Sequence, residues 1–228
     1  MKKIIFSMLA AMMTLTAMAQ SDVWYWKDGA ATKVEAVDSI TFEAPVVPTD
    51  THEYVDLGLS VKWATCNVGA TSPEDYGDYF AWGETTAKEI YLWDTYTMTA
   101  DGKTVLDAED DAAAVNWGGA WRMPTLDEMK ELLNPDNCSW EWTTVNEVNG
   151  YKVTSKKEGY TDKSLFLPAA GYRDGSSLSN AGSLGYYWSA TRYEFYPDCA
   201  YYLYFYSGFR DWGGSSRCLG FTVRPVCP

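Results

Sequence analysis

The C-terminal part of the chain constrains the fold more than any other segment. Fourteen of the 36 residues in 186–221 are aromatic, and residues 200–206 (AYYLYFY) alternate between two kinds of position. Successive side chains of a β-strand point to opposite faces. One face therefore carries Tyr201, Leu203 and Phe205, and the other carries Tyr202, Tyr204 and Tyr206. Because leucine and phenylalanine favour the core, the pattern predicts a strand with a buried face and an outward row of tyrosines.

Two helices are expected in the middle of the chain. Thr125 and Glu128 form a T-x-x-E capping box at the start of residues 125–133. The apolar positions of that segment share one helix face: Leu126, Met129, Leu132 and Leu133. Residues 107–116 predict a shorter helix with acids in its first turns. Everything after Trp140 is β-rich with Gly/Ser turns, and no βαβ alternation is present, which predicts an α+β fold.

One charged residue is expected in the core of the last strand. Leu219, Phe221 and Val223 form its buried face, and Arg224 follows them directly. Since an unpaired buried guanidinium is very costly, Arg224 is expected to be paired with a carboxylate or with backbone carbonyls.

The N-terminus has the features of a secretory signal peptide over residues 1–19. Lys2 and Lys3 precede an apolar run, and Ala17-Met18-Ala19 is an A-x-A cleavage site. The apolar run is too short to span a membrane, and no cysteine near the site supports a lipid anchor. We therefore expect an exported protein without membrane insertion, located in the periplasm, at the cell surface or outside the cell.

The exported chain divides into three parts. Residues 20–43 predict a small β-hairpin unit, since Asp28-Gly29 is a strong two-residue turn signal between strand-like segments. Residues 44–52 are rich in Pro and Thr without periodicity, which is typical of a linker. Residues 53–228 are expected to form the main domain.

Charge and histidine content exclude several classes of function. The chain has 31 Asp and Glu against 18 Lys and Arg, a formal charge of −13. Such a polyanion repels nucleic acid and anionic lipid. The single histidine, His52, leaves no basis for His-based catalytic triads or His metal clusters. We expect no cofactor, no metal and no catalytic activity.

Three ordered blocks of the main domain resemble a known family. They are residues 54–69 (YVDLGLSVKWATCNVG), residues 117–133 (WGGAWRMPTLDEMKELL) and residues 185–227 (GYYWSAT, AYYLYFYS and GFTVRPVC). Together they resemble the Fibrobacter succinogenes major paralogous domain family of exported bacterial proteins. The R-M-P-T-x-x-E-M segment also looks like a helix of formylglycine-generating enzymes.

The resemblance implies a C-type-lectin-like fold for residues 53–228, with two helices and a loop-rich antiparallel β region. It also implies a disulfide between Cys66 and Cys227, because both lie in matching blocks. Cys138–Cys227 is the second choice, and five reduced cysteines are a further alternative. Some relatives within this wider fold are diversified by retroelements, and the loop residues 209–217, Trp212 aside, fit the residue set that this mechanism produces.

The expected function is that of a non-catalytic recognition module for a protein or glycan ligand. Aromatic and arginine side chains on loops bury a large contact area at low entropic cost. The residues expected to contact the ligand are Tyr193, Phe195, Tyr196, Tyr204, Tyr206, Arg210, Trp212 and Arg217. Two alternatives remain open: an enzyme of the formylglycine-generating type of fold, and a structural or assembly component of the cell surface.

Overall fold

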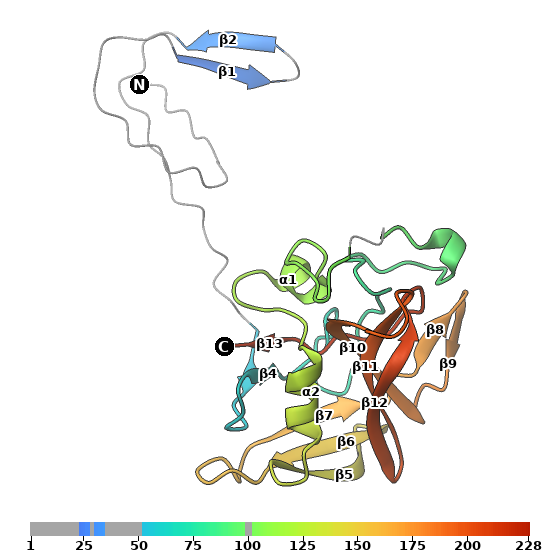
Figure 1. The fold of residues 1–228 in the computed structure, drawn as a ribbon. Helices are drawn as coiled ribbons and strands as arrows, with labels where there is room; N and C mark the ends of the chain where they lie inside the picture. Colours follow the sequence, from blue (N-terminus) through green and yellow to red (C-terminus); the bar gives the residue numbers. More distant parts are fainter. Residues whose placement is uncertain (1–22, 28–29, 35–51, 99–101) are drawn as a thin grey trace. The chain divides into compact units, whose positions relative to one another are not determined.

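A computed structural model describes residues 23–27, 30–34, 52–98 and 102–228 (Figure 1). The chain divides into two compact units, residues 1–49 and 50–228. In the first unit, β1 (Val23–Lys27) pairs antiparallel with β2 (Ala30–Val34). The predicted signal peptide, the Asp28-Gly29 turn and nearly all of the predicted linker lie outside the described residues.

The described residues of the second unit form two α-helices, α1 (Ala112–Trp117) and α2 (Leu126–Leu133), and a short 3₁₀ helix, Trp93–Thr95. The capping box of α2 forms as expected: Thr125 Oγ1 accepts the Glu128 N–H, and the Glu128 carboxylate accepts the Thr125 N–H. The predicted first helix is shorter than 107–116. Asp111, which is its N-cap, accepts the N–H groups of Ala113 and Ala114, so the preceding acids lie before the helix.

The strands seen in the described part of the second unit form four antiparallel sheets. The first consists of β3 (Tyr54–Val55), β4 (Lys62–Ala64) and β13 (Val226–Cys227). The second consists of β5 (Cys138–Val145), β6 (Val148–Ser155) and β7 (Ser164–Pro168). The third pairs β8 (Tyr172–Asp174) with β9 (Ser177–Ser179). The fourth, in the order β10-β11-β12, consists of β10 (Leu184–Arg192), β11 (Cys199–Tyr206) and β12 (Phe209–Ser216).

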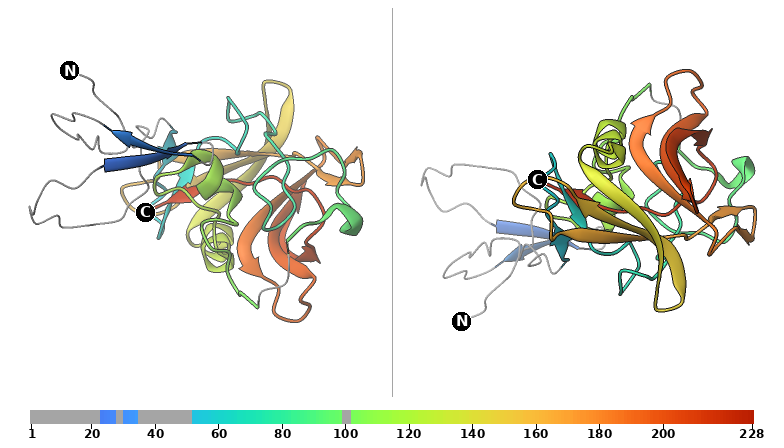
Figure 2. Two further views of the ribbon diagram at one scale, coloured as in Figure 1. Left: turned by 90° about the horizontal axis from the view of Figure 1, so that it is seen from above. Right: turned by 90° about the horizontal axis from the view of Figure 1, so that it is seen from below.

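The architecture is therefore α+β and β-rich, as the sequence predicts. Helix α2 packs against the β10-β11-β12 sheet, and Figures 1 and 2 show it beside these strands from several directions. The buried face of α2 carries Leu126, Met129 and Leu132.

The main core lies between α2, the β5-β6-β7 sheet and one face of β10-β11-β12. Phe205 is fully buried there, and its ring centroid is 5.3 Å from that of Tyr151 and 5.8 Å from that of Tyr187. A second cluster surrounds Trp188 and Phe221, whose rings stack at 4.1 Å. The predicted alternation along β11 is confirmed: Tyr201, Leu203 and Phe205 are buried, while Tyr206 on the other face is exposed.

Arg224 is buried and hydrogen-bonded, as expected. Its Nε donates to Asn67 Oδ1 at 2.8 Å, and its Nη1 donates to the carbonyl oxygens of Ala64, at 3.0 Å, and Thr65. Its partners are thus an amide side chain and backbone carbonyls. Burial lowers the pKa of Arg224 below its ordinary value.

No disulfide joins the five cysteines, which all lie within the described residues. The register explains why the expected Cys66–Cys227 bridge is absent: Cys227 lies opposite Lys62, four positions away from Cys66 along the chain. The second choice, Cys138–Cys227, is absent too. Cys138 belongs to the main core, whereas Cys227 packs with Ala64 and Trp121 in a separate cluster.

Candidate functional site: a face between α2 and β12

The register of β11 and β12 divides the expected ligand contacts between two faces of one sheet. Residues that lie directly opposite each other in an antiparallel pair share a face. Leu203 lies opposite Trp212, and Phe205 lies opposite Arg210. Trp212 and Arg210 are therefore on the face that α2 covers in part, whereas Tyr204 is on the opposite face.

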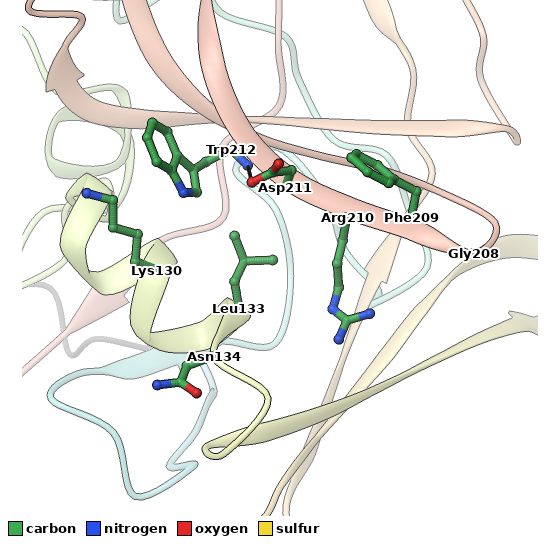
Figure 3. A pocket seen from close by; sticks show the side chains of 8 residues that line it. All are labelled: Lys130, Leu133, Asn134, Gly208, Phe209, Arg210, Asp211 and Trp212. Atoms are coloured by element: carbon green, nitrogen blue, oxygen red, sulfur yellow. Dashed lines mark hydrogen bonds between the residues drawn. The ribbon is translucent and has the colours of Figure 1, made fainter.

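A pocket of about 470 Å³ lies between the C-terminal half of α2 and the β11-β12 hairpin (Figure 3). We call it the α2-β12 groove. Its lining residues come from two stretches of chain: Lys130, Leu133 and Asn134 from α2 and the residue after it, and Gly208, Phe209, Arg210, Asp211 and Trp212 from the hairpin. Figure 3 shows the Trp212 ring and the Arg210 guanidinium on the side of the strand that faces α2.

Trp212 and Lys130 meet across this groove. The Lys130 Nζ lies 4.8 Å from the centroid of a Trp212 ring, within the range of a cation–π contact. The nearest acid to Lys130 is Asp127, whose Oδ1 is 3.6 Å from the Nζ on an exposed part of the helix. Trp212 keeps 39% of its surface exposed, although most tryptophans of the core are buried. The groove thus has an accessible indole next to a cation.

Arg210 is the second cation of the groove. Its guanidinium carbon lies 5.5 Å from the ring centroid of Trp140. Its Nε is buried without a hydrogen-bond partner. Within the described part of the chain, none of the ion pairs involves Arg210. A buried donor without a partner is costly.

The aromatic residues of the β10-β11 loop extend the same face. The Tyr193 ring lies 4.7 Å from Tyr201, which in turn lies 5.6 Å from Trp212. Phe195 and Tyr196 both contact the Tyr193 ring, and they are 67% and 65% exposed. This row and the groove form one continuous surface, which we call the recognition face: Tyr193, Phe195, Tyr196, Arg210, Trp212 and Lys130.

A glycine makes room for that arrangement. Gly214 lies opposite Tyr201 on β12, and a Cβ added to it would lie 2.6 Å from the Tyr193 ring. The ring of Tyr193 therefore rests on the backbone of β12. Any side chain at position 214 would push the β10-β11 loop away from the strand.

Tyr204 and Tyr206 lie on the opposite face of the sheet from Arg210 and Trp212, so the structure does not bring the eight expected contact residues together on one face. Their face carries a stacked row of rings in which Tyr202 lies 5.5 Å from Tyr186 and 5.3 Å from Tyr204. Tyr206 stacks on Phe209 at 5.1 Å. Burial raises the pKa of Tyr202 to about 12. This row packs largely on itself, and only Tyr206 is well exposed.

Arg217 was expected on the surface, and the structure places it in the interior. It is 4% exposed, and its guanidinium carbon lies 5.5 Å from the Trp82 ring and 5.4 Å from the Tyr96 ring. β12 ends at Ser216, where the chain turns inward, and the Trp82 N–H donates to the Arg217 carbonyl at 2.9 Å. The Arg217 side chain therefore packs against Trp82 and Tyr96 in the interior.

The contributions of α2 were missed by sequence reasoning. Lys130, Leu133 and Asn134 are spaced three and four residues apart, so they form one stripe on the helix. That spacing was readable from the sequence. Which strand the stripe faces is set by tertiary packing, and no local signal carries that information.

The described residues contain no group of three or more His, Cys, Asp or Glu side chains that could hold a metal ion. In the same part of the chain, no helix has the length and apolar character needed to cross a membrane.

One stretch of the second unit is similar to a known family model. Residues 140–226 match the model of a domain of unknown function, DUF8237. The match runs from β5 to β13, so it includes β12 and the β10-β11 loop but not α2. Neither the curated proteins nor the solved structures give a match.

Proposed function

We propose that this chain is an exported, non-catalytic recognition domain whose ligand contacts the recognition face. The observation that carries the proposal is the convergence of five expected contact residues on one surface. Tyr193, Phe195, Tyr196, Arg210 and Trp212 come from a loop and a strand, and they lie beside a groove with two cations.

The chemistry of this surface suits binding. Phe195 and Tyr196 expose about two thirds of their surfaces, which is unusual for large aromatic residues. Tyrosine and tryptophan bury much area while losing few rotamers, and arginine adds directional donors. The strands beneath them are fixed by a packed core, so the surface is held ready for a partner.

We further propose that residues 53–228 have a C-type-lectin-like fold and belong to the Fibrobacter succinogenes major paralogous domain family. The order of the three sequence blocks supports this, as do the two helices and the antiparallel sheets. The proposed export rests on the charged start, the apolar run and the A-x-A site of residues 1–19.

A comparison of two double variants tests the recognition function. Arg210→Ala/Trp212→Ala alters the recognition face, and Tyr204→Ala/Tyr206→Ala alters the opposite face of the same sheet. Immobilised wild type and both variants are incubated with cell-surface material, and bound proteins and glycans are identified. We expect the first variant to lose the partners that wild type and the second variant retain. Equal recovery by all three would refute the proposed site.

A further inference from the structure

β12 is an edge strand with its outer side open. It pairs with β11 on one side, and within the described residues no strand or isolated bridge occupies its other side. In an antiparallel ladder, alternate residues direct their N–H and C=O groups toward the neighbouring strand, and the residues between them direct theirs away. Every second residue of β12 therefore directs its backbone N–H and C=O groups to the open side.

Two independent contacts identify the outward set. The Trp212 N–H donates to the Asp211 carboxylate at 2.8 Å, which points it away from β11. On the far side of the sheet, the Tyr186 carbonyl accepts from Thr222 and the Trp188 N–H donates to the Thr222 carbonyl. The backbone N–H and C=O groups of Tyr186 and Trp188 thus point away from β11.

The register then gives the assignment for β12. Tyr186 lies opposite Tyr204, and Trp188 lies opposite Tyr202. The backbone groups of Tyr202 and Tyr204 therefore point toward β12, where the residues opposite them are Gly213 and Asp211. The residues between those partners, Arg210, Trp212 and Gly214, present their backbone groups to the open edge.

The α2-β12 groove borders β12 and includes Arg210 and Trp212 of the outward set. It is lined by five consecutive residues, from Gly208 to Trp212 (Figure 3). At about 3.3 Å per residue, four steps along a strand cover about 13 Å. Such a length matches a peptide of four to five extended residues. Lys130 and Arg210 are the cations along it, and Asp211 is its one acid.

We propose that the ligand of this groove is an acidic peptide segment that adds to β12 as a fourth strand. Its backbone would pair with Arg210, Trp212 and Gly214, and its carboxylates would meet Arg210 and Lys130. Strand addition is a general mode of peptide recognition in which backbone bonds supply affinity and side-chain pockets supply specificity. The inference rests on the proposed function, for which it names the ligand class.

Asp211 has a defined part in this scheme. Its carboxylate covers the Trp212 N–H in the absence of a partner. A charged side chain on an edge strand hinders pairing between copies of one protein. The incoming strand has to replace this contact with one of its own carbonyl groups.

A peptide fits the groove better than a sugar. The backbone donors and acceptors of β12 recur at the spacing of a β-strand. An extended peptide has backbone groups at the same spacing, whereas a sugar does not. In addition, Lys130 already lies over a Trp212 ring, so that stacking surface is partly covered.

The experiment uses a capped hexapeptide of alternating valine and glutamate, and its glutamine counterpart as the neutral control. Affinity is measured by calorimetry and amide hydrogen exchange by NMR, on the full exported chain. We expect the acidic peptide to slow exchange at the amides of Arg210, Trp212 and Gly214. Arg210→Gln and Lys130→Gln are each expected to weaken binding about tenfold, which corresponds to about 1.4 kcal/mol, and Lys163→Gln, outside the groove, is expected to leave it unchanged.

N-methylated peptides separate strand addition from simple charge attraction. Methylation of the valine amides and of the glutamate amides removes donors from opposite edges of an extended peptide. If the peptide binds by strand addition, methylation of one of these two sets of amides abolishes binding and methylation of the other set preserves it. Equal effects of the two sets, or equal affinity for the glutamine peptide, would overturn the inference.

Failure of this inference can be told apart from failure of the proposed function. If oligogalacturonate binds in an Arg210-dependent manner and the peptide does not, the peptide assignment is wrong and recognition at this face stands. If neither probe binds, and Arg210→Ala/Trp212→Ala captures the same cell-surface partners as wild type, both are wrong.

Discussion

The ammonium of Lys130 lies 4.8 Å from the centre of a Trp212 ring, and this contact joins helix α2 to the edge strand β12. The two residues are far apart in the sequence, and neither is buried. Their contact defines one wall of the α2-β12 groove and holds the indole beside a cation. The proposed binding of a ligand at the recognition face depends on this geometry.

The fold itself depends on Phe205. Phe205→Ala is expected to lower the free energy of unfolding by about 3–5 kcal/mol, because a fully buried ring is lost from the main core. Tyr206→Ala changes the next residue, which points to the other face, and should cost less than about 1 kcal/mol. Urea unfolding of both variants measures the difference, and similar losses would contradict the assignment of the faces.

Gly214 is expected to be intolerant of a side chain. Gly214→Ala places a methyl group against the Tyr193 ring, which should cost about 1–3 kcal/mol. Gly213→Ala is the matched control, since its Cβ would lie 3.3 Å from the Tyr202 ring, a contact that a small movement of the ring relieves. In a double-mutant cycle, Tyr193→Ala should remove most of the penalty at position 214. Additive effects would show that the ring does not rest on this glycine.

The start of α2 should depend on pH through Glu128. Burial alone would raise the pKa of Glu128, but hydrogen bonds from Arg122 and Thr125 outweigh burial and leave the pKa below its ordinary value. A lowered folded-state pKa means that the contribution is present above the unfolded pKa, about 4.3, and is lost as the pH falls through the folded value.

Glu128→Gln should therefore destabilise the protein by about 1–2 kcal/mol at pH 7, a figure reduced by the partial exposure of Arg122. The difference from wild type should shrink as the pH falls below about 4. Thermal unfolding across this pH range measures it. A difference that stays constant down to pH 2 would contradict the role of the carboxylate charge.

Arg224 tests the packing of the last strands. Arg224→Met leaves the carbonyls of Ala64 and Thr65 and the Asn67 oxygen without their donor. Each such group costs about 1–3 kcal/mol, so we expect a total loss of about 3 kcal/mol or more in denaturant unfolding. Unchanged stability would mean that the desolvation of the guanidinium cancels its hydrogen bonds.

The sequence predicted those features that depend on local pattern. The alternation along β11 and the capping box of α2 follow from residue spacing, and both are confirmed. The Ser207-Gly208 turn sets the register of the β11-β12 hairpin, and this register decides on which face of the sheet Arg210 and Trp212 lie. The faces of these two residues could therefore have been predicted from the sequence.

The errors concern residues whose surroundings come from distant parts of the chain. Arg217 is buried by Trp82 and Tyr96, which lie more than a hundred residues earlier. Cys227 is placed opposite Lys62 by strand pairing. The groove has α2 as its second wall. The spacing of Lys130, Leu133 and Asn134 does not indicate which strand these residues face.

Site-specific photo-crosslinking reports which face of the β10-β11-β12 sheet contacts a ligand. A benzophenone amino acid is placed at Trp212 in one variant and at Tyr206, on the opposite face, in another. Both are irradiated with cell-surface material, and the adducts are identified by mass spectrometry. We predict a defined adduct at position 212 that Arg210→Ala diminishes and that position 206 does not form. The same adducts at both positions, or an adduct at 206 alone, would contradict this prediction.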